Sequence, residues 1–540
     1  MKLFVSLIFL STFLVFAEGE KRPNIVFIIA DDMTRDMFNL LPEGKGKNLT
    51  PNLDRLATEG TFLEGLHVSS TVCTPSRFSC LTGLYASRAY TEGHMDQSLI
   101  DGQIVVRWNS HITAKTQNLA KVLQKWGYKT GAAGKNHVID VPEWAPAHKL
   151  KEGSPEALER MALNAKLIKE AYKACGFDYA EGIFHENVEL NAPGKLGVHN
   201  VDWMTAAGLD FIDQQTEEDP FFLYFPFTTT HGPRDHKRNW QADPKATPLG
   251  MLDKPLDVLP ARETIPARLK EAGIRVSKGK QVYREDVLWM DDALGEMMKK
   301  LEDKNLLDNT IIVFFNDHGQ YAKGTLYEGG VSSPTYIWKK GGFPVGKETP
   351  ALLSNIDFAP TLIEYAGVDQ STLKPFDGKS FKGILDGTET KIHDSLYMEM
   401  GFSRAILKDD MKYLVLRYPD SIANMSLKRR KKVLETFQKR MKAKHTPVHN
   451  DDPTKGFSHV SAIPGGGNAE LMSIKRYKHY FDTDQLYDLR NDGKEQNNVV
   501  NSPEYKAKLE IMQAELKKYL ETLPGSFAEF KECAVEEAQH

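Results

Sequence analysis

Four apolar or glycine-rich segments of this chain each run directly into polar residues. The segments are 24–30, 128–134, 221–227 and 310–315, and the polar residues that follow them are Asp31 and Asp32, Lys135 and His137, His231, and Asp317 and His318. Short runs rich in β-branched and aromatic residues are typical of strands buried on both faces. The pattern therefore requires a sheet that is covered on both sides.

Helical patterns at 51–60, 116–127 and 286–305 lie between these segments. Strands that alternate with helices predict an α/β fold, with a large mixed, mostly parallel sheet sandwiched by helices. In such sheets ligands bind beyond the carboxyl ends of the strands. We therefore expect the polar residues at the four strand ends to meet in one site.

The alternation ends near residue 395, so we predict a catalytic domain over 20–395 and a smaller α+β subdomain over 396–540. In the subdomain, 403–418 and 484–498 indicate a small antiparallel sheet. The segment between them predicts a docked helix within 426–445, because an apolar stripe recurs at helical spacing in Val433, Leu434, Phe437 and Met441. Its basic outer face is either a solvated charged surface or a contact for a polyanionic substrate.

The N-terminus has the layout of a secretory signal peptide over residues 1–19. Lys2 precedes an apolar run over 3–16, and the small residue Ala17 follows it. A retained anchor is the alternative, although the run is short for a membrane span, and no later apolar stretch reaches the required length of about 18 residues. We expect an exported mature chain that does not span a membrane. It would be periplasmic or secreted in a bacterium, and secretory or lysosomal in a eukaryote.

Charge and cysteine content exclude other classes of protein. A net charge of −4 and a pI near 6.5 do not suggest a nucleic-acid partner. Four cysteines in a chain of this size do not make a disulfide scaffold, although one bridge is possible; they are Cys73, Cys80, Cys175 and Cys533. We expect Cys80 to be a small packed apolar residue. The sequence does not indicate an oligomeric state.

The carboxylates at the strand ends point to a metal ion. Asp31, Asp32 and Asp317 would repel one another in a partly buried site, and a hard cation removes that repulsion. Oxygen ligands without a cysteine pair favour Ca²⁺ or Mg²⁺ over zinc, although His318 would be an unusual partner for Ca²⁺. A single aspartate here, such as Asp32, could instead cap a helix.

Cationic and imidazole groups accompany the carboxylates. They are Arg77, Lys135, His137, His231 and Lys323. A lone buried histidine is usually a core residue, but five such groups beside a metal suit a tetrahedral oxyanion, either phosphate or sulfate.

Residues 73–83, CTPSRFSCLTG, match the Cys-x-Pro-Ser-Arg-x-x-x-Leu-Thr-Gly signature of a known family. The chain resembles the type I, formylglycine-dependent sulfatases of the alkaline phosphatase superfamily. Other segments resemble sulfatase landmarks in the same order, from residue 24 to residue 498; among them are IVFIIADD, TPNLDRLATEG, GYKTGAAGKNH, TTTHGP and NDHGQYAKGTLYEGG. The resemblance implies an alkaline phosphatase-like fold and, together with export, a carbohydrate sulfatase.

The resemblance also implies a role for each site residue. A maturation enzyme would oxidise Cys73 to Cα-formylglycine (3-oxoalanine), whose hydrate is the nucleophile, and Arg77 would hold that hydrate. One Ca²⁺ per chain would bind Asp31, Asp32, Asp317, His318 and an oxygen of modified Cys73. The remaining motif positions are Lys135, His137, His231 and Lys323.

The expected mechanism follows from the charge of the substrate. Ca²⁺, Arg77, Lys135 and Lys323 would offset the sulfate charge for in-line attack. His231 with Lys323 would assist the leaving alcohol, and His137 would take the proton that releases sulfate. A helix expected to begin at 78–83 would point its N-terminus at the anion.

Specificity is expected from loops near the strand ends. The candidates are His94, Arg107, Trp108, His111, Arg234, His236 and Arg404. Together they favour a sulfated poly- or oligosaccharide, because tryptophan with arginine or histidine suits a sugar ring that bears anionic groups.

Three alternatives remain open from the sequence. The chain could be a phosphodiesterase or phosphonate hydrolase of the same superfamily, or an N-sulfate hydrolase. It could also be a non-catalytic polyanion-binding protein in which Cys73 is unmodified.

Overall fold

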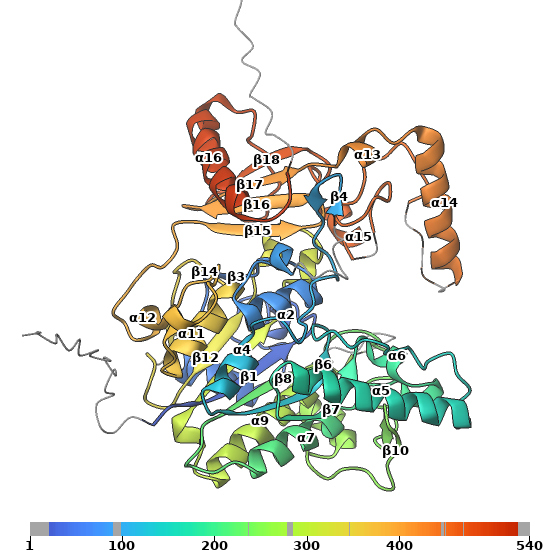
Figure 1. The fold of residues 1–540 in the computed structure, drawn as a ribbon, viewed down its shortest axis with the longest axis vertical. Helices are drawn as coiled ribbons and strands as arrows, with labels where there is room; N and C mark the ends of the chain where they lie inside the picture. The colour runs from blue at the N-terminus through green and yellow to red at the C-terminus, as the bar shows by residue number, and fades with distance from the viewer. Residues whose placement is uncertain are drawn as a thin grey trace, which may run out of the picture.

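The computed structural model describes residues 21–527 apart from 90–98, 236, 278–283, 345, 444–445, 447, 449 and 468. The predicted signal peptide, His94, His236 and Cys533 lie outside the described residues. Among the described residues, the main sheet has eight strands (Figure 1). In spatial order they are β13 (Lys347–Glu348), β2 (Thr61–Phe62), β12 (Thr335–Trp338), β11 (Thr310–Asn316), β1 (Asn24–Ala30), β8 (Phe221–Pro226), β6 (Lys129–Asn136) and β7 (Tyr179–His185).

Strand β1 lies at the centre of this sheet. It pairs in parallel with β11 on one side and with β8 on the other. β6 and β7 continue the parallel arrangement beyond β8. β12 runs antiparallel to β11, and β2 runs antiparallel to β12. The sheet is therefore mixed and mostly parallel, as predicted.

All four predicted strands are present, and β6 extends further than expected. It continues to Asn136, so Lys135 lies inside the strand and not after it. Gly134 allows this course because its φ is 113° and because any side chain there would collide with the carbonyl oxygen of Pro226 in β8. The close approach of β6 to β8 carries Lys135 toward the end of β1.

Helices cover both faces of the main sheet. Side chains of β1 alternate between two cores, so Phe27 packs in one and Ile28 in the other. The helices around Ile28 are α1 (Pro51–Glu59), α7 (Val201–Asp213), α8 (Ile265–Glu271) and α9 (Arg284–Asp303). Those around Phe27 are α2 (Cys73–Thr82), α4 (Leu119–Lys125), α5 (Pro155–Ala174) and α11 (Phe358–Tyr365). The helical patterns at 51–60, 116–127 and 286–305 correspond to α1, α4 and α9.

A second, four-stranded antiparallel sheet lies at one end of the molecule (Figure 1). Its strands are β15 (Leu396–Met400), β16 (Ser403–Lys408), β17 (Met411–Leu416) and β18 (Asp484–Asp488). Helix α16 (Lys506–Thr522) packs on this sheet. Helix α14 (Leu427–Ala443) buries Leu434, Phe437 and Met441, which belong to the predicted apolar stripe.

The described chain also contains short strands and helices. They are β3 (Leu66–His67), β4 (Leu99–Ile100), β5 (Gln103–Ile104), β9 (Ala246–Thr247), β10 (Gly250–Met251), β14 (Leu353–Ser354), α6 (Val188–Asn191), α10 (Glu328–Val331), α12 (Lys382–Leu385), α13 (Asp420–Ala423) and α15 (Leu471–Arg476). Within the described ranges, no helix combines the length and apolar character needed to cross a bilayer.

A buried ion-pair cluster joins the small sheet to the rest of the chain. The Nζ atom of Lys412, in β17, lies 2.7 Å from Oε1 of Glu328 and 2.9 Å from Oε1 of Glu495. Glu328 begins α10, five residues after Lys323, and its Oε2 lies 3.2 Å from Nε2 of His67. Because a fully buried charge must be paired, Lys412 ties β17 to the segment that carries Lys323.

We predict that Lys412→Met destabilises the protein by about 3–5 kcal/mol, because it leaves buried carboxylates without their cation. Lys408→Met on the neighbouring strand is the control. The side chain of Lys408 is partly exposed and its one hydrogen bond, to the carbonyl of Asp394, lies at the surface, so its loss should change stability by no more than about 0.5 kcal/mol. Denaturant unfolding followed by circular dichroism measures both. Equal stability of the two variants would contradict a structural role for the cluster.

Candidate active site

The carboxyl ends of β1 and β11 bring the predicted acidic residues together. Asp31 and Asp32 follow β1, and Asp317 and His318 follow β11; the parallel register pairs Ala30 with Asn316 immediately before them. All four side chains are buried. The main-chain N–H of Asp32 also donates to Oδ1 of Asp317, at 3.3 Å.

Cys73 lies beside these carboxylates as the first residue of α2. Its side chain has no exposed surface. We expected a helix from Phe78, and it begins five residues earlier. The reason is that the signature segment itself is helical. Pro75 lies in the first turn of the helix, where a main-chain N–H has no partner within the helix, so the missing N–H of proline costs nothing. Cys73 is therefore at the positive end of the α2 dipole.

The donor set around Cys73 fits a hard divalent cation. Nε2 of His318 lies 3.3 Å from Oδ1 of Asp32 and 3.6 Å from Oδ1 of Asp317. The Sγ of Cys73 lies 3.5 Å from Oδ1 of Asp31. Two sets of three residues place their ligand atoms within 4.8 Å of one another; they are Asp32, Cys73 and His318, and Asp31, Cys73 and Asp317. Carboxylate oxygens with a single imidazole suit Ca²⁺ or Mg²⁺ better than zinc.

The three carboxylates are not equally compensated. Burial alone would raise the pKa of Asp31 and of Asp32, but Lys135 beside Asp31 and Lys323 beside Asp32 hold both values well below the usual range. Burial raises the pKa of Asp317, and the nearby cations do not overcome it. Asp317 is therefore the carboxylate whose charge the protein's own cations offset least.

Three fixed cations surround the same point. The guanidinium of Arg77 is fully buried, with NH2 3.2 Å from Oδ2 of Asp317. Lys135 forms an ion pair with Asp31. Nζ of Lys323 lies 2.6 Å from Oδ1 of Asp32 and 3.7 Å from Sγ of Cys73. The site thus holds groups that can bind an oxyanion on several sides.

The unmodified Cys73 is a poor nucleophile in this setting. Burial, followed by the charge of Asp31, raises the pKa of its thiol well above the usual value. The thiolate is the nucleophilic form of cysteine, and this environment disfavours it. Cys73, Cys80 and Cys175 are all buried and free. Cys80 is a packed residue, as predicted, with its Sγ 3.7 Å from Nδ2 of Asn355.

His137 is held as a base by Glu186. Its Nε2 lies 3.0 Å from Oε2 of Glu186, so Nε2–H donates to the carboxylate. Burial and then the charge of Lys135 lower the pKa of His137, which keeps the ring neutral. Nδ1 is buried and has no hydrogen-bond partner among the described residues. This tautomer presents a free lone pair, which is the form that accepts a proton.

Sequence reasoning missed Glu186. It follows β7, whose segment ends in Phe184 and His185 before the carboxylate. It lies directly after a strand, as the other acidic residues do, but the rule that identified them requires the strand to be recognised first. The segment was overlooked because β7 is an edge strand with only partly apolar sequence.

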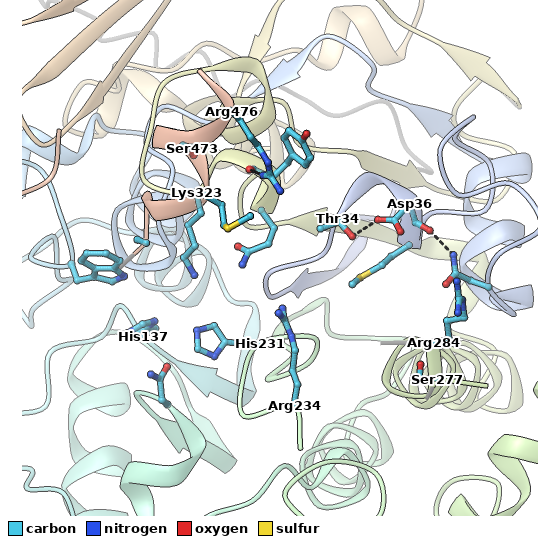
Figure 2. Close-up of a pocket in the computed structure, with 18 of the residues that line it drawn as sticks. Thr34, Asp36, His137, His231, Arg234, Ser277, Arg284, Lys323, Ser473 and Arg476 are labelled. Atoms are coloured by element: carbon cyan, nitrogen blue, oxygen red, sulfur yellow. Dashed lines mark hydrogen bonds between the residues drawn. The ribbon is translucent and has the colours of Figure 1, made fainter. Parts of the chain in front are cut away.

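His231 lies across the site from His137. Its Nδ1 donates to the carbonyl of Gly232 at 2.7 Å, and its Nε2 lies 3.7 Å from Oδ2 of Asp32. Burial and then Lys135 lower its pKa to about 3. Figure 2 shows His231, His137 and Lys323 converging on the floor of the cleft.

An open cleft of about 890 Å³ leads to these three residues. Its lining includes Trp108, Arg234, Gln320, Tyr321, Arg284 and Arg476. Of the predicted specificity residues, Trp108 and Arg234 line the cleft. Nε of Arg234 donates to the carbonyl of Thr230 at 2.6 Å.

The other predicted specificity residues lie elsewhere. Arg107 and His111 are partly buried on the same loop as Trp108 and are not among the residues that line the cleft. Arg404 is only 4% exposed, and its guanidinium donates to the carbonyls of Gly401, Ser403 and Ile104. We therefore replace the predicted substrate-binding role of Arg404 with a structural one.

The fold and the site together define a class of protein. A mostly parallel sheet with helices on both faces carries carboxylates, cations and a helix N-terminus at its carboxyl edge, which is the architecture of an alkaline phosphatase-like hydrolase of anionic esters. A phosphonate monoester hydrolase from Agrobacterium radiobacter shares this fold, with a TM-score of 0.55, 17% identity and coverage of 94% of this chain and 97% of that one.

The family follows from the sequence match. The Sulfatase family model matches residues 23–368, so the chain belongs to the sulfatase family and is a sulfuric ester hydrolase. The chain is 24% identical to the ulvan-active sulfatase of Formosa agariphila over 531 residues, which are 93% of this chain and 75% of that protein. A similar solved structure is BT4656 bound to D-glucosamine-2-N,6-O-disulfate, with a TM-score of 0.56, 19% identity and coverage of 93% and 98%. A non-catalytic polyanion-binding protein is thereby excluded.

We predict that Glu186→Gln lowers kcat by about 10- to 100-fold, because it removes the carboxylate that fixes the tautomer of His137. The matched control is Glu181→Gln, earlier on β7, whose carboxylate pairs with Lys169 on the surface. Steady-state rates of sulfate release from p-nitrophenyl sulfate measure the effect. An unchanged kcat in Glu186→Gln, or an equal loss in the control, would contradict the assigned role.

Proposed function

We propose that this enzyme removes sulfate from a sulfated poly- or oligosaccharide, with Cys73 matured to Cα-formylglycine and one Ca²⁺ bound beside it. The observation that carries the proposal is the convergence of three carboxylates and three fixed cations on Cys73, beneath an open cleft with an aromatic wall. The ulvan-active and glucosamine-disulfate-bound relatives support a carbohydrate substrate.

The charge balance of the site favours a sulfate ester over a neutral substrate. The formal charges of Asp31, Asp32 and Asp317 cancel those of Arg77, Lys135 and Lys323. A bound Ca²⁺ would leave two positive charges, and a sulfate monoester would bring one negative charge that the buried site can then accept. Asp31, Asp32, Asp317 and His318, with the oxygen of the modified side chain, would hold the ion. When bound, it would supply positive charge to the sulfate oxygens.

The chain's own residues have distinct tasks in hydrolysis, which converts the ester and water to an alcohol and sulfate. Cys73 matured to formylglycine hydrate would supply one hydroxyl to attack sulfur and a second whose deprotonation releases sulfate. Arg77 and Lys135 hold the oxyanion in line for attack. His137 accepts a proton at Nδ1, while Glu186 stabilises the resulting imidazolium.

The leaving alcohol departs next to His231 and Lys323. Nδ1 of His231 donates to the carbonyl of Gly232, so Nε2 is the ring atom that can exchange a proton with the leaving oxygen. The ammonium of Lys323 lies 3.7 Å from Sγ of Cys73. It is therefore close enough to the reacting sulfur to offset negative charge on the sulfate oxygens.

We also propose that residues 1–19 direct export and are removed, and that the catalytic domain spans 20–395 and the subdomain 396–540. The support for export is the layout of the N-terminal sequence. The support for the boundary is that the strands of the small sheet begin at Leu396.

Calcium is expected to stabilise the folded protein. At a Ca²⁺ concentration about 100 times Kd, a single site adds about 2.7 kcal/mol to the free energy of unfolding. Asp317→Asn should abolish the Ca²⁺-dependent rise in melting temperature. Asp308→Asn, at the opposite end of β11 and paired with Lys340 on the surface, should retain it. A rise that persists in Asp317→Asn would refute this metal site without reference to activity.

The substrate class is tested by a screen of purified protein against defined sulfated saccharides, with free sulfate as the readout. Peptide mass spectrometry of the segment around Cys73 first confirms the aldehyde or its hydrate. An N-sulfated sugar, a phosphodiester and a phosphonate monoester are included. We expect O-sulfate release that Cys73→Ala abolishes. The proposal is wrong if none of the saccharides releases sulfate or if phosphoesters are turned over faster. It is also wrong if an active enzyme carries an unmodified thiol at Cys73.

A further inference from the structure

One wall of the cleft carries polar groups that the reaction does not use. Gln320 and Tyr321 belong to the 3₁₀ turn Gln320–Ala322, and Arg476 ends α15. All three line the cleft. The turn runs directly into Lys323, whose ammonium contacts Asp32 and Cys73.

Arg476 is held in a fixed orientation on this wall. Its guanidinium carbon lies 3.5 Å from the centroid of the Tyr321 ring, and NH1 donates to the carbonyl of Tyr321. Its remaining guanidinium nitrogens have no partner among the described residues. A stacked guanidinium loses less freedom on binding and keeps an edge available for two parallel hydrogen bonds. Figure 2 shows Arg476 reaching down from α15 toward the cleft.

Gln320 supplies an independent indication of a ligand. Its Oε1 is buried and has no hydrogen-bond partner among the described residues. A buried amide oxygen without a partner is costly, and a rotation of the side chain toward the cleft that it lines would let a donor of a bound molecule remove that cost. The hydroxyl groups of a sugar are such donors.

Carboxylates do not occupy this wall. Asp36 and Glu186 are the acidic residues that line the described part of the cleft. Oδ1 of Asp36 accepts a hydrogen bond from Thr34, and Glu186 pairs with His137. The unsatisfied charge beside Tyr321 is therefore positive.

This wall is adjacent in the chain to a residue of the reacting centre. Tyr321 precedes Lys323 by two residues, so their Cα atoms are separated by no more than about 7 Å. A saccharide whose scissile sulfate lies beside Lys323 therefore extends along this wall, and we take the second anion to lie on the same sugar or on its neighbour.

We propose that Gln320, Tyr321 and Arg476 form a subsite for a second anionic group, a sulfate or a carboxylate, on the sugar chain. The inference rests on the proposed function and deepens it, because it makes the preferred substrate a saccharide with at least two charges. Arg476 binds the second anion with its free edge, and Gln320 accepts a hydroxyl of the same ring. The exposed part of the Tyr321 ring provides an apolar surface for that ring.

Binding to the Cys73→Ala protein tests the subsite without requiring turnover. The ligands are galactose-based and glucosamine-based disaccharides that carry one 6-O-sulfate on the first ring. The second ring is neutral in one form, carries a sulfate in another, and is a uronate in the third. Calorimetry gives the Kd of each. We expect at least one of the charged forms to bind more tightly than the neutral one, and the better form identifies sulfate or carboxylate as the preferred group.

We define the affinity ratio as the affinity for the charged form divided by that for the neutral form. Arg476→Gln should reduce this ratio by about 10- to 100-fold, as expected for the loss of a charge-assisted hydrogen bond. Lys475→Gln removes the same charge from the adjacent, exposed position of α15 and should keep the ratio. Arg476→Lys should recover it only partly, because lysine lacks the planar fork. High salt should also reduce the ratio.

Several outcomes would overturn the subsite. In the unsubstituted subsite, these outcomes are equal affinity for all three forms or no binding of any form. In the variants, they are an equal loss of both affinities in Arg476→Gln or the same effect in Lys475→Gln. Sulfate release by the mature enzyme tests the proposed function separately. A protein that hydrolyses singly charged saccharides without preference would keep the proposed function and lose this inference.

Discussion

The parallel pairing of β1 with β11 and β8 is the constraint on which the rest of the site depends. It places two consecutive carboxylates after β1 next to a third after β11, within a buried space. That arrangement is unfavourable unless cations surround it. Three cations from different elements pair with these carboxylates: Arg77 from α2, Lys135 from β6 and Lys323 from the segment after β11. The same cations then serve to bind an anionic ester.

The main sheet and its site could be predicted from the sequence for a physical reason. Strands buried on both faces must be continuously apolar, so the point where polarity begins marks the strand end. This rule predicted that Asp31 and Asp317 follow directly on strands, which is where they lie, after β1 and β11. It failed at β7, because an edge strand is only half buried and its sequence, YAEGIFH, is mixed. Glu186 was missed for that reason.

Specificity residues could not be predicted in the same way. Arg404 was a candidate because it lies near the start of the small sheet, but its guanidinium donates to main-chain carbonyls inside that part of the molecule. Arg476 carries no distinguishing signal in the sequence, because its role depends on the contact of α15 with Tyr321, 155 residues earlier in the chain. Contacts between distant segments are set by packing, and local patterns do not reveal them.

The complete burial of Cys73 has a consequence for the life of the protein in the cell. A sulfur atom with no exposed surface at the start of a packed helix is beyond the reach of any other protein once the chain has folded. An enzyme that oxidises it must therefore act on the extended chain, in competition with folding itself. Under the proposed function, molecules that fold first would keep the thiol of Cys73 and lack the hydroxyl nucleophile. The fraction of active enzyme would then depend on the rate of oxidation relative to the rate of folding. Conditions that speed folding would lower the specific activity of the purified protein.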